Sequence, residues 1–424
     1  MSSGERVYDV MVIGAGFAGM AAALFAASRG RSVALAGSTG GIDFSTGLID
    51  LMGVHPVEQG RRWDDPWAAI RAVVRDCPEH PYALVPEAQI RIALKQFSDF
   101  LAEQGLPYVG DHDRNIPVIT PAGTVKRTFF TPASAHAGTV AFEEKAPTLL
   151  VDFHGLKGFS GAQIVENLGP QWPDLRTVRI DFPGGRGELY PEHMAWTMAD
   201  PARREELVKH LAEHVGNACF IGFPAILGLI DPMKIIHHLE SLTGLRIFEI
   251  PTLPPSIAGT RLRAAFDRGL PGLGADTFSQ KMVIQGERED GGTFLFRVGN
   301  ERHNLSVRSR AAILATGRFF GKGLRTDRKK VFEPIFNLPV IQPQARTDWH
   351  QERFFDAQGH PVNMAGVQVD DCMRPLNDSG KSAYGNLYAA GAVLAHHDWM
   401  RMKCGAGLAV ATAYKAVACM AESG

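Results

Sequence analysis

The sequence has 424 residues, of which 45% are hydrophobic and 21% are charged, a balance typical of folded globular proteins. Its formal net charge of −1 gives no reason to expect a nucleic-acid partner, and no basic run is interleaved with aromatic residues. Its five cysteines lack the spacing of iron–sulfur or other metal ligands, so no metal site is assigned.

The first 36 residues predict a β–α–β unit. A short apolar run, Val7–Ile13, is typical of a buried strand, an alanine-rich helix follows it, and Ser32–Ala36 is a second strand. Gly14, Gly16 and Gly19 form a GxGxxG motif between the first strand and the helix. In this context the first glycine makes the tight turn, the second admits a pyrophosphate and the third lets helix and strand pack closely. The motif therefore predicts a nucleotide-binding site at the start of the helix.

The acidic residue that usually accompanies this motif is missing. Dinucleotide-binding folds place Asp or Glu at the end of the second strand, where it holds the adenosine ribose, but this position lies near Gly37. A hydrogen bond to a charged group is worth roughly 1.5–3 kcal/mol, so its loss weakens adenosine binding about 10- to 150-fold. FMN, which has no adenosine, avoids this problem. FAD stays an alternative, since the hydroxyls of Ser38 and Thr39 can substitute.

The middle of the chain predicts an inserted region with its own parallel sheet. Val118–Ile119 and Val125–Phe130 read as a β-hairpin. Further strand-like runs alternate with helical stretches, at Leu149–Phe153, Val178–Phe182, Cys219–Phe223 and Arg246–Ile250. We expect a Rossmann-type, two-dinucleotide-binding α/β flavoprotein fold with an inserted α/β cap domain. Its predicted parts are a first flavin-binding segment (1–60), an inserted β-hairpin and cap region (61–255) and the returning flavin-binding segments (256–424).

Three later strings match the flavin version of this fold better than the nicotinamide version. Thr316 and Gly317 end a strand in an Ala-Thr-Gly turn, and the string that ends at Gly391 resembles the late strand under a flavin. The acid that usually follows this last glycine is replaced by Ala392. Gly405 and Gly407 open the last helix, whose N-terminal dipole favours negative charge on a reduced flavin.

Five further strings extend over most of the chain: Asp43–Leu51, His80–Tyr82, Pro251–Ser256, Ala315–Leu324 and Glu333–Ile335. Through these strings the chain resembles a specific family, the B subunits of anaerobic glycerol-3-phosphate dehydrogenase, within the fumarate reductase/succinate dehydrogenase flavoprotein superfamily. The resemblance implies an FMN-binding member of a respiratory complex that oxidises glycerol 3-phosphate to dihydroxyacetone phosphate and passes electrons to quinone. Its implied partners, the A and C subunits, are a catalytic subunit that carries FAD and an iron–sulfur subunit that anchors the complex to the membrane.

Ser45, Thr46 and Gly47 lie in the first of these strings and are candidate flavin contacts, because short hydroxyl side chains there can donate to the flavin or its phosphate. Lys403 is a candidate neighbour of flavin N1, and His396 and His397 are candidate proton carriers. No catalytic residue is assigned. Two other functions stay open: a self-sufficient flavoenzyme of the fumarate reductase type acting on a small hydroxy acid or dicarboxylate, and a structural subunit without a cofactor.

The sequence contains no apolar run long enough to span a membrane. The longest, Ala218–Ile230, is interrupted by Pro224 and is shorter than the ~20 residues that a spanning helix needs. The N-terminal residues lack the apolar core of a signal peptide. We therefore expect a cytoplasmic protein that is peripheral on the inner face of the cell membrane through a partner subunit.

Overall fold

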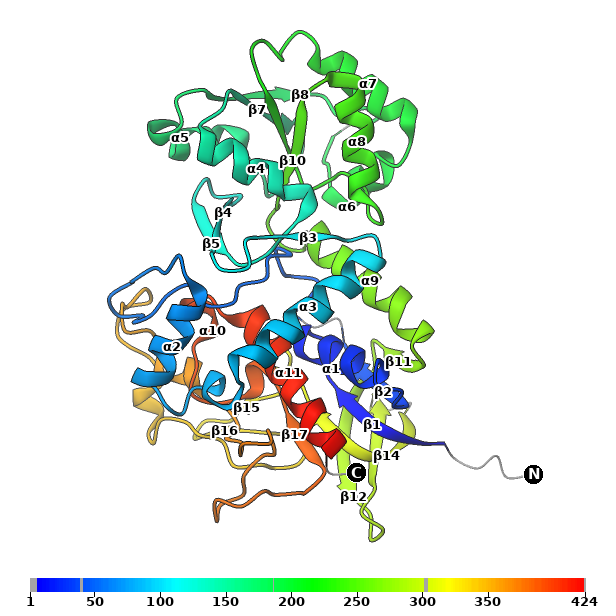
Figure 1. Cartoon of the computed structure of the whole chain (residues 1–424), viewed down its shortest axis with the longest axis vertical. Helices are drawn as coiled ribbons and strands as arrows, with labels where there is room; N and C mark the ends of the chain where they lie inside the picture. Colours follow the sequence, from blue (N-terminus) through cyan, green and yellow to red (C-terminus); the bar gives the residue numbers. More distant parts are fainter. Residues whose placement is uncertain (1–5, 39–40, 186, 301–303, 423–424) are drawn as a thin grey trace, which may run out of the picture. The chain divides into compact units, whose positions relative to one another are not determined.

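The computed structural model describes residues 6–38, 41–185, 187–300 and 304–422 (Figure 1). The chain divides into two compact units. Unit 1 comprises residues 1–42, 50–100 and 266–424, and unit 2 comprises residues 43–49 and 101–265. Residues 61–100, which were expected in the inserted region, fall in unit 1 in this division.

A mostly parallel sheet forms the centre of unit 1. Its strands are β1 (Val7–Ile13), β2 (Val33–Gly37), β11 (Ala275–Ser279), β12 (Met282–Arg288), β13 (Phe294–Gly299), β14 (Asn304–Leu314) and β17 (Leu387–Ala389). Strands β11, β2, β1 and β14 lie side by side and run parallel. The first half of β14 pairs with antiparallel β13, and its last residues pair with parallel β17. The β–α–β unit predicted from the sequence is confirmed, and the carboxyl ends of β1 and β14 meet beside the glycine motif.

Two long apolar helices pack against each other in unit 1, as Figure 1 shows for α1 and α11. The unit's helices are α1 (Phe17–Ala27), α2 (Pro66–Asp76), α3 (Glu87–Glu103, which continues into unit 2), α10 (Trp399–Met402) and α11 (Gly405–Glu422). Its short 3-10 turns are η1 (Pro81–Leu84), η3 (Arg346–Asp348), η4 (Pro361–Met364) and η5 (Gly391–Val393), and its small strands are β15 (Arg325–Thr326) and β16 (Val331–Phe332). Alanine and glycine let α1 and α11 approach closely, and the pair carries the N-termini that border the candidate site.

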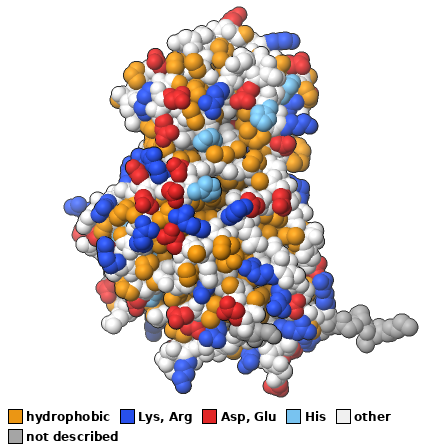
Figure 2. Space-filling model, in the orientation of Figure 1, with side chains coloured by type: hydrophobic (Ala, Val, Ile, Leu, Met, Phe, Trp, Pro, Cys, Tyr) orange, Lys and Arg blue, Asp and Glu red, His pale blue; other side chains and the backbone are white. Residues whose placement is uncertain are grey.

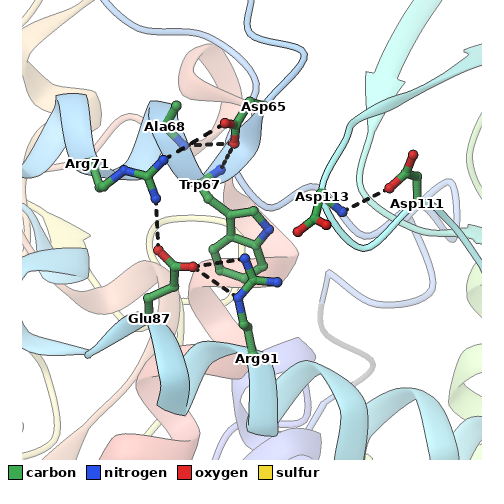
Figure 3. Close-up of polar contacts among 8 residues, drawn as sticks. All are labelled: Asp65, Trp67, Ala68, Arg71, Glu87, Arg91, Asp111 and Asp113. Carbon is green, nitrogen blue, oxygen red and sulfur yellow. Dashed lines mark hydrogen bonds and ion pairs between the residues drawn. The ribbon is translucent and has the colours of Figure 1, made fainter.

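Charged and aromatic side chains join α2 to the start of α3 at the surface of unit 1 (Figure 3). Asp65 caps α2 by accepting hydrogen bonds from the N–H groups of its first turn. Glu87 at the start of α3 accepts from Arg71 of α2 at 3.0 Å, and Arg91 lies 3.8 Å from the ring centre of Trp67. Exposed ion pairs of this kind contribute little stability. Figure 2 shows acidic and basic side chains interspersed over the face of the molecule in view.

Unit 2 has a separate four-stranded parallel sheet in the order β10–β9–β7–β8, which confirms the predicted parallel sheet. These strands are β7 (Thr148–Phe153), β8 (Leu175–Ile180), β9 (Phe220–Pro224) and β10 (Arg246–Ile250). The predicted hairpin is confirmed as β4 (Ile116–Ile119) and β5 (Val125–Thr128), and β3 (Tyr108–Val109) pairs with β6 (Thr131–Pro132). The helices are α4 (Ala133–Glu144), α5 (Gly161–Leu168), α6 (Pro191–Thr197), α7 (Pro201–Leu211), α8 (Pro232–Thr243) and α9 (Ile257–Gly272, which continues into unit 1), with the 3-10 turn η2 (Gly169–Gln171).

A buried ion pair links β10 to α9 in unit 2. The carboxylate of Glu249 accepts from both terminal nitrogens of Arg261, at 2.6 and 2.9 Å, and both side chains are buried. Glu249 also accepts from the N–H of Leu227, and Arg261 Nε donates to the carbonyl of Gly228. Both charges are therefore paired and hydrogen-bonded, which is the condition under which buried charges are tolerated.

We expect Glu249→Ala to lower the free energy of unfolding by about 3–5 kcal/mol, because it leaves the buried Arg261 guanidinium without its carboxylate. The matched control is Glu206→Ala, which breaks the half-exposed Arg203–Glu206 pair of α7 and should cost at most about 1 kcal/mol. Urea unfolding followed by circular dichroism measures both values. Equal effects of the two substitutions would contradict this assignment.

Candidate functional site

The turn between β1 and α1 requires glycine at two positions. Gly14 has a φ of +117°, and a Cβ built on it lies 2.3 Å from the carbonyl oxygen of Ala315, at the end of β14. A Cβ on Gly19 lies 1.7 Å from the carbonyl oxygen of Gly14, so the helix starts directly against the turn. The first and third glycines of the motif therefore serve the fold, by letting three backbone segments meet at one point.

Gly16 differs from both, because a Cβ built on it meets no atom within 4 Å. It is the N-cap residue of α1, and no side chain caps this helix. Within the described part of the chain, the N–H groups of Gly16, Phe17 and Ala18 have no hydrogen-bond acceptor. Free N–H groups and the positive end of the helix dipole at an open position are the features that bind a phosphate.

The end of β2 explains the missing acid in structural terms. Gly37 is the last residue of β2, and a Cβ built on it lies 2.4 Å from the nitrogen and 2.8 Å from the Cβ of Ala15. No side chain fits there unless the phosphate turn moves, so an acid is excluded by packing as well as by sequence. Ser38, the next residue, is exposed and follows the strand directly, while Thr39 lies outside the described residues.

Thr316, Gly317 and Gly391 come to the same region of unit 1 from distant parts of the sequence. The Cα of Thr316 lies 3.1 Å from a Cβ built on Gly14, and a Cβ on Gly391 lies 2.5 Å from the Cβ of Ala18 in α1. The hydroxyl oxygen of Thr316 is buried and has no hydrogen-bond partner among the described residues. A buried hydroxyl without a partner is uncommon, and a Cβ built on Gly323 lies 2.3 Å from this oxygen, so the hydroxyl lies against the loop at Gly323.

Gly405 and Gly407 begin α11 in unit 1. The N–H of Gly407 donates to the carbonyl of Asp50 at 2.8 Å, and a Cβ on Gly407 lies 2.8 Å from the Cα of Leu51. In α11 Thr412 accepts from the N–H of Gly391 at 2.9 Å, which ties η5 to this helix. The starts of α1 and α11 and the turns after β14 and β17 thus form one connected site, which includes all the predicted glycines of unit 1.

Ser45, Thr46 and Gly47 belong to unit 2. Ser45 Oγ accepts from the N–H of Gly47 at 3.3 Å, and the carbonyl of Gly47 accepts from the Tyr108 hydroxyl at 2.7 Å. A Cβ on Gly47 lies 2.8 Å from the Cβ of Ala258, so this turn is packed within its own unit. Their assignment as flavin contacts stays a prediction.

Next to the site in unit 1 lies a buried polar cluster that was not predicted from the sequence as one group. Arg318 follows Gly317 directly, and its buried guanidinium donates to the carbonyls of Asn363, Leu394 and His397. Burial lowers the pKa of Arg318 to about 10, despite the opposing effect of nearby Asp398. Within the described residues Arg318 forms no ion pair with a carboxylate, so backbone carbonyls satisfy most of its donors.

Two buried imidazoles complete this cluster. His80 Nδ1 accepts from the N–H of Tyr82 at 3.2 Å, and the ring centres of His80 and His397 lie 6.0 Å apart. Burial lowers the pKa of His80 to about 3 and that of His397 well below its usual value, so both rings are neutral near pH 7. The Nε2 atoms of both rings are buried and have no partner among the described residues. The sequence gives no signal for this cluster beyond the family strings around His80 and Arg318, because burial and proximity are tertiary properties.

The other two candidates, His396 and Lys403, lie outside this group of hydrogen bonds. His396 Nδ1 lies 3.4 Å from the carboxylate of Glu79, and its Nε2 is buried without a partner among the described residues. Lys403 is an exposed residue at the C-cap of α10, in a left-handed conformation. No group of three or more His, Cys, Asp or Glu side chains that could hold a metal ion occurs in the described ranges.

Comparison with known proteins identifies a family and several relatives. A family model described as "FAD binding domain" matches residues 9–408. The B subunit of anaerobic glycerol-3-phosphate dehydrogenase from Vibrio vulnificus (strain YJ016) is 32% identical over 426 residues, or 97% of this chain and 95% of that protein. The probable B subunit of the same enzyme from Halobacterium salinarum (strain ATCC 29341 / DSM 671 / R1) is 34% identical over 435 residues and 98% of each chain.

A solved structure, the 3-ketosteroid delta1-dehydrogenase from Sterolibacterium denitrificans, aligns over 99% of this chain and 100% of that chain. Its TM-score is 0.44 at 12% sequence identity, and a likeness this distant carries no functional argument.

Proposed function

We propose that this chain is the flavin-dependent B subunit of an anaerobic glycerol-3-phosphate dehydrogenase complex. The chain belongs to the FAD-binding-domain family and to the family of the B subunits of this enzyme. Its fold is accordingly the α/β fold of FAD-binding flavoproteins. In the proposed reaction, the complex oxidises glycerol 3-phosphate to dihydroxyacetone phosphate and passes the electrons to quinone.

The observation that carries a flavin site is the uncapped start of α1. Its N–H groups lack acceptors within the described residues, and the space in front of Gly16 is open. These features fit a flavin phosphate, because they offer neutral donors and a partial positive charge where no side chain competes.

Each element of the site has a distinct task in this proposal. The N–H groups at Gly16 and the two following residues hold the phosphate, and Gly14 and Gly19 keep the turn tight enough to present them. Gly317 leaves open space for the extended cofactor, and Gly391 lets its turn pack against Ala18 of α1. The N-terminus of α11 at Gly405 stabilises negative charge that develops on the cofactor. The flavin, when bound, supplies the capacity to accept and release electrons, and the protein supplies binding, orientation and electrostatics.

We propose FMN as the flavin, although the family is described by FAD. The packing of Gly37 against Ala15 removes the position from which an acid would hold an adenosine ribose. The exposed hydroxyl of Ser38 is the nearest substitute, and it is neutral. A neutral hydrogen bond is worth about 0.5–1.5 kcal/mol against about 1.5–3 kcal/mol for a charged one. FAD therefore gains little from its adenosine half in this site.

We expect the purified chain to be yellow and to release mainly FMN on denaturation, with FAD binding the apoprotein no more tightly than FMN. Chromatography of the released flavin and fluorescence titration of the apoprotein with each flavin measure these properties. In the matched variant Ser38→Asp, the added carboxylate should raise the affinity for FAD relative to FMN. Stoichiometric FAD in the purified protein would refute the choice of FMN, and a chain that binds neither flavin would refute the flavin role.

The complex also needs two partners in this proposal. One is a catalytic subunit that carries FAD, here called the catalytic subunit; the other is an iron–sulfur subunit that holds the assembly at the inner face of the cell membrane, here called the anchor subunit. The relatives' designation as B subunits implies a multi-subunit assembly. Among the described residues, no helix combines the length and apolar character needed to cross a bilayer. In this proposal, electrons that leave this chain reach quinone through the anchor subunit.

A further inference from the structure

Unit 1 carries a group of exposed apolar side chains, on loops and on the short helices η4 and α10, that border the candidate flavin site. Phe355, Phe354 and Phe320 are 89%, 78% and 68% exposed. The full group, here called the apolar patch, consists of Phe320, Phe354, Phe355, Met364, Trp399 and Met400. Single exposed apolar residues are common, but several large ones on adjoining loops mark interaction surfaces.

Hydrogen bonds hold the loops of the apolar patch together. Arg318 donates to the carbonyls of Asn363 and His397, so the chain segments that lead to Phe320, Met364 and Trp399 share one guanidinium. The carbonyl of Phe354 accepts from His360 Nε2 at 3.0 Å, next to η4. The rings of Phe354 and Phe355 are edge to face, with centres 4.8 Å apart. The patch is therefore pre-organised, which lowers the entropic cost of binding.

The apolar patch adjoins the flavin site at two points. Phe320 is three residues after Gly317, and Arg318 is the link between them. Trp399 begins α10, and its ring lies 2.9 Å from a Cβ built on Gly405 at the start of α11. A protein bound to the patch would cover one side of the flavin site.

A strongly basic segment continues from the patch along the chain. Between residues 322 and 330 there are five exposed or half-exposed cations and one carboxylate, in a protein whose net charge is −1. The cations are Lys322, Arg325, Arg328, Lys329 and Lys330, and none forms an ion pair with any residue that the structure describes. The carbonyl of Asp327 accepts from Arg346 at 3.2 Å, which joins this segment to the one that leads to Phe354.

We propose that the apolar patch and its basic border form the docking surface for the anchor subunit of the complex, which carries the iron–sulfur clusters. This inference rests on the proposed function. A thiolate-ligated iron–sulfur cluster carries negative charge, so a protein that exposes its cluster edge fits a surface with an apolar centre and a basic border. The position beside the flavin site brings the two redox centres to either side of one interface.

The test uses the complete chain, co-expressed with the anchor subunit or with the catalytic subunit. In the first variant, Phe354→Ser and Phe355→Ser together remove the most exposed rings. We expect its affinity for the anchor subunit to fall about 10- to 100-fold, as for central aromatic residues of interfaces. In the second, Lys329→Glu and Lys330→Glu should slow association with the anchor subunit, and the association rate should depend less on salt. Binding kinetics at two salt concentrations measure both effects.

The matched control is Trp196→Ser, which removes a 60% exposed ring from α6 in unit 2 and should leave the affinity for the anchor subunit unchanged. Flavin content and circular dichroism check that each variant is folded. Unchanged affinity for the anchor subunit in both patch variants would overturn the proposal. Loss of affinity for the catalytic subunit alone would also overturn it. So would a defect that appears only when the variants are tested for binding to phosphatidylserine vesicles. If the unmodified chain lacks flavin or forms no active complex, the proposed function itself fails, and that result is separate from the variants.

Discussion

Gly16→Val should leave this chain folded but without flavin. The space in front of Gly16 is open within 4 Å, so a valine side chain meets no protein atom and the fold tolerates it. The same side chain occupies the place where the phosphate would approach the free N–H groups of α1. We expect flavin occupancy of the purified variant to fall at least about 100-fold, because a phosphate that loses several charge-assisted hydrogen bonds loses roughly 3 kcal/mol or more.

Two other glycine substitutions serve as references for this result. Gly19→Val should prevent folding of unit 1, because a Cβ there already lies 1.7 Å from the carbonyl oxygen of Gly14. Gly385→Val is the matched control, since a Cβ on Gly385 also meets nothing within 4 Å. It should keep both fold and flavin. Absorbance near 450 nm measures flavin, and thermal unfolding measures the fold. Full flavin occupancy in Gly16→Val would show that the phosphate turn is assigned wrongly.

These glycines differ in how much of their structural role can be predicted from the sequence. The motif at Gly14, Gly16 and Gly19 predicts the turn correctly because the β–α–β unit is local, and its spacing alone implies the strand–turn–helix order. The absence of an acid near Gly37 is also visible in the sequence. Its cause is not visible, since the clash with Ala15 arises between the ends of two parallel strands that pair in the folded chain.

Long-range features are harder to predict. Arg318 lies in a string that identifies the family, yet its carbonyl partners lie 45 to 79 residues further along the chain. His80 and His397 are separated by more than 300 residues and meet only through tertiary packing. Ser45 and Thr46 are candidates because of their residue type and their place beside a glycine. Neither property distinguishes a flavin contact from a packed turn such as the one at Gly47.

The isolated chain is expected to oxidise glycerol 3-phosphate poorly, with turnover at least about 100-fold below that of the assembled complex. Removal of hydride from C2 requires a base for the hydroxyl proton, and a positioned general base contributes about 10²–10⁴-fold to the rate. The buried histidines next to the site are poor candidates for this base. Burial lowers the pKa of His80 to about 3, and His397 is fully enclosed beside the Arg318 guanidinium. Neither ring holds a proton readily near neutral pH.

Dye-linked turnover tests this expectation in three preparations: the chain alone, the chain with the catalytic subunit, and the Gly16→Val chain with the catalytic subunit. Substrate oxidation should appear in both mixtures, because the substrate site then belongs to the added protein. With the anchor subunit in membranes also present, only the mixture with the unmodified chain should reduce quinone at the full rate. The reason is that, in the proposed complex, the flavin of this chain carries electrons from the catalytic subunit to the clusters, and the variant has lost it. Full turnover by the isolated chain would place the substrate site in this sequence and favour a self-sufficient flavoenzyme. Undiminished quinone reduction by the flavin-free variant would give this chain a purely structural role, because electrons would then bypass its site.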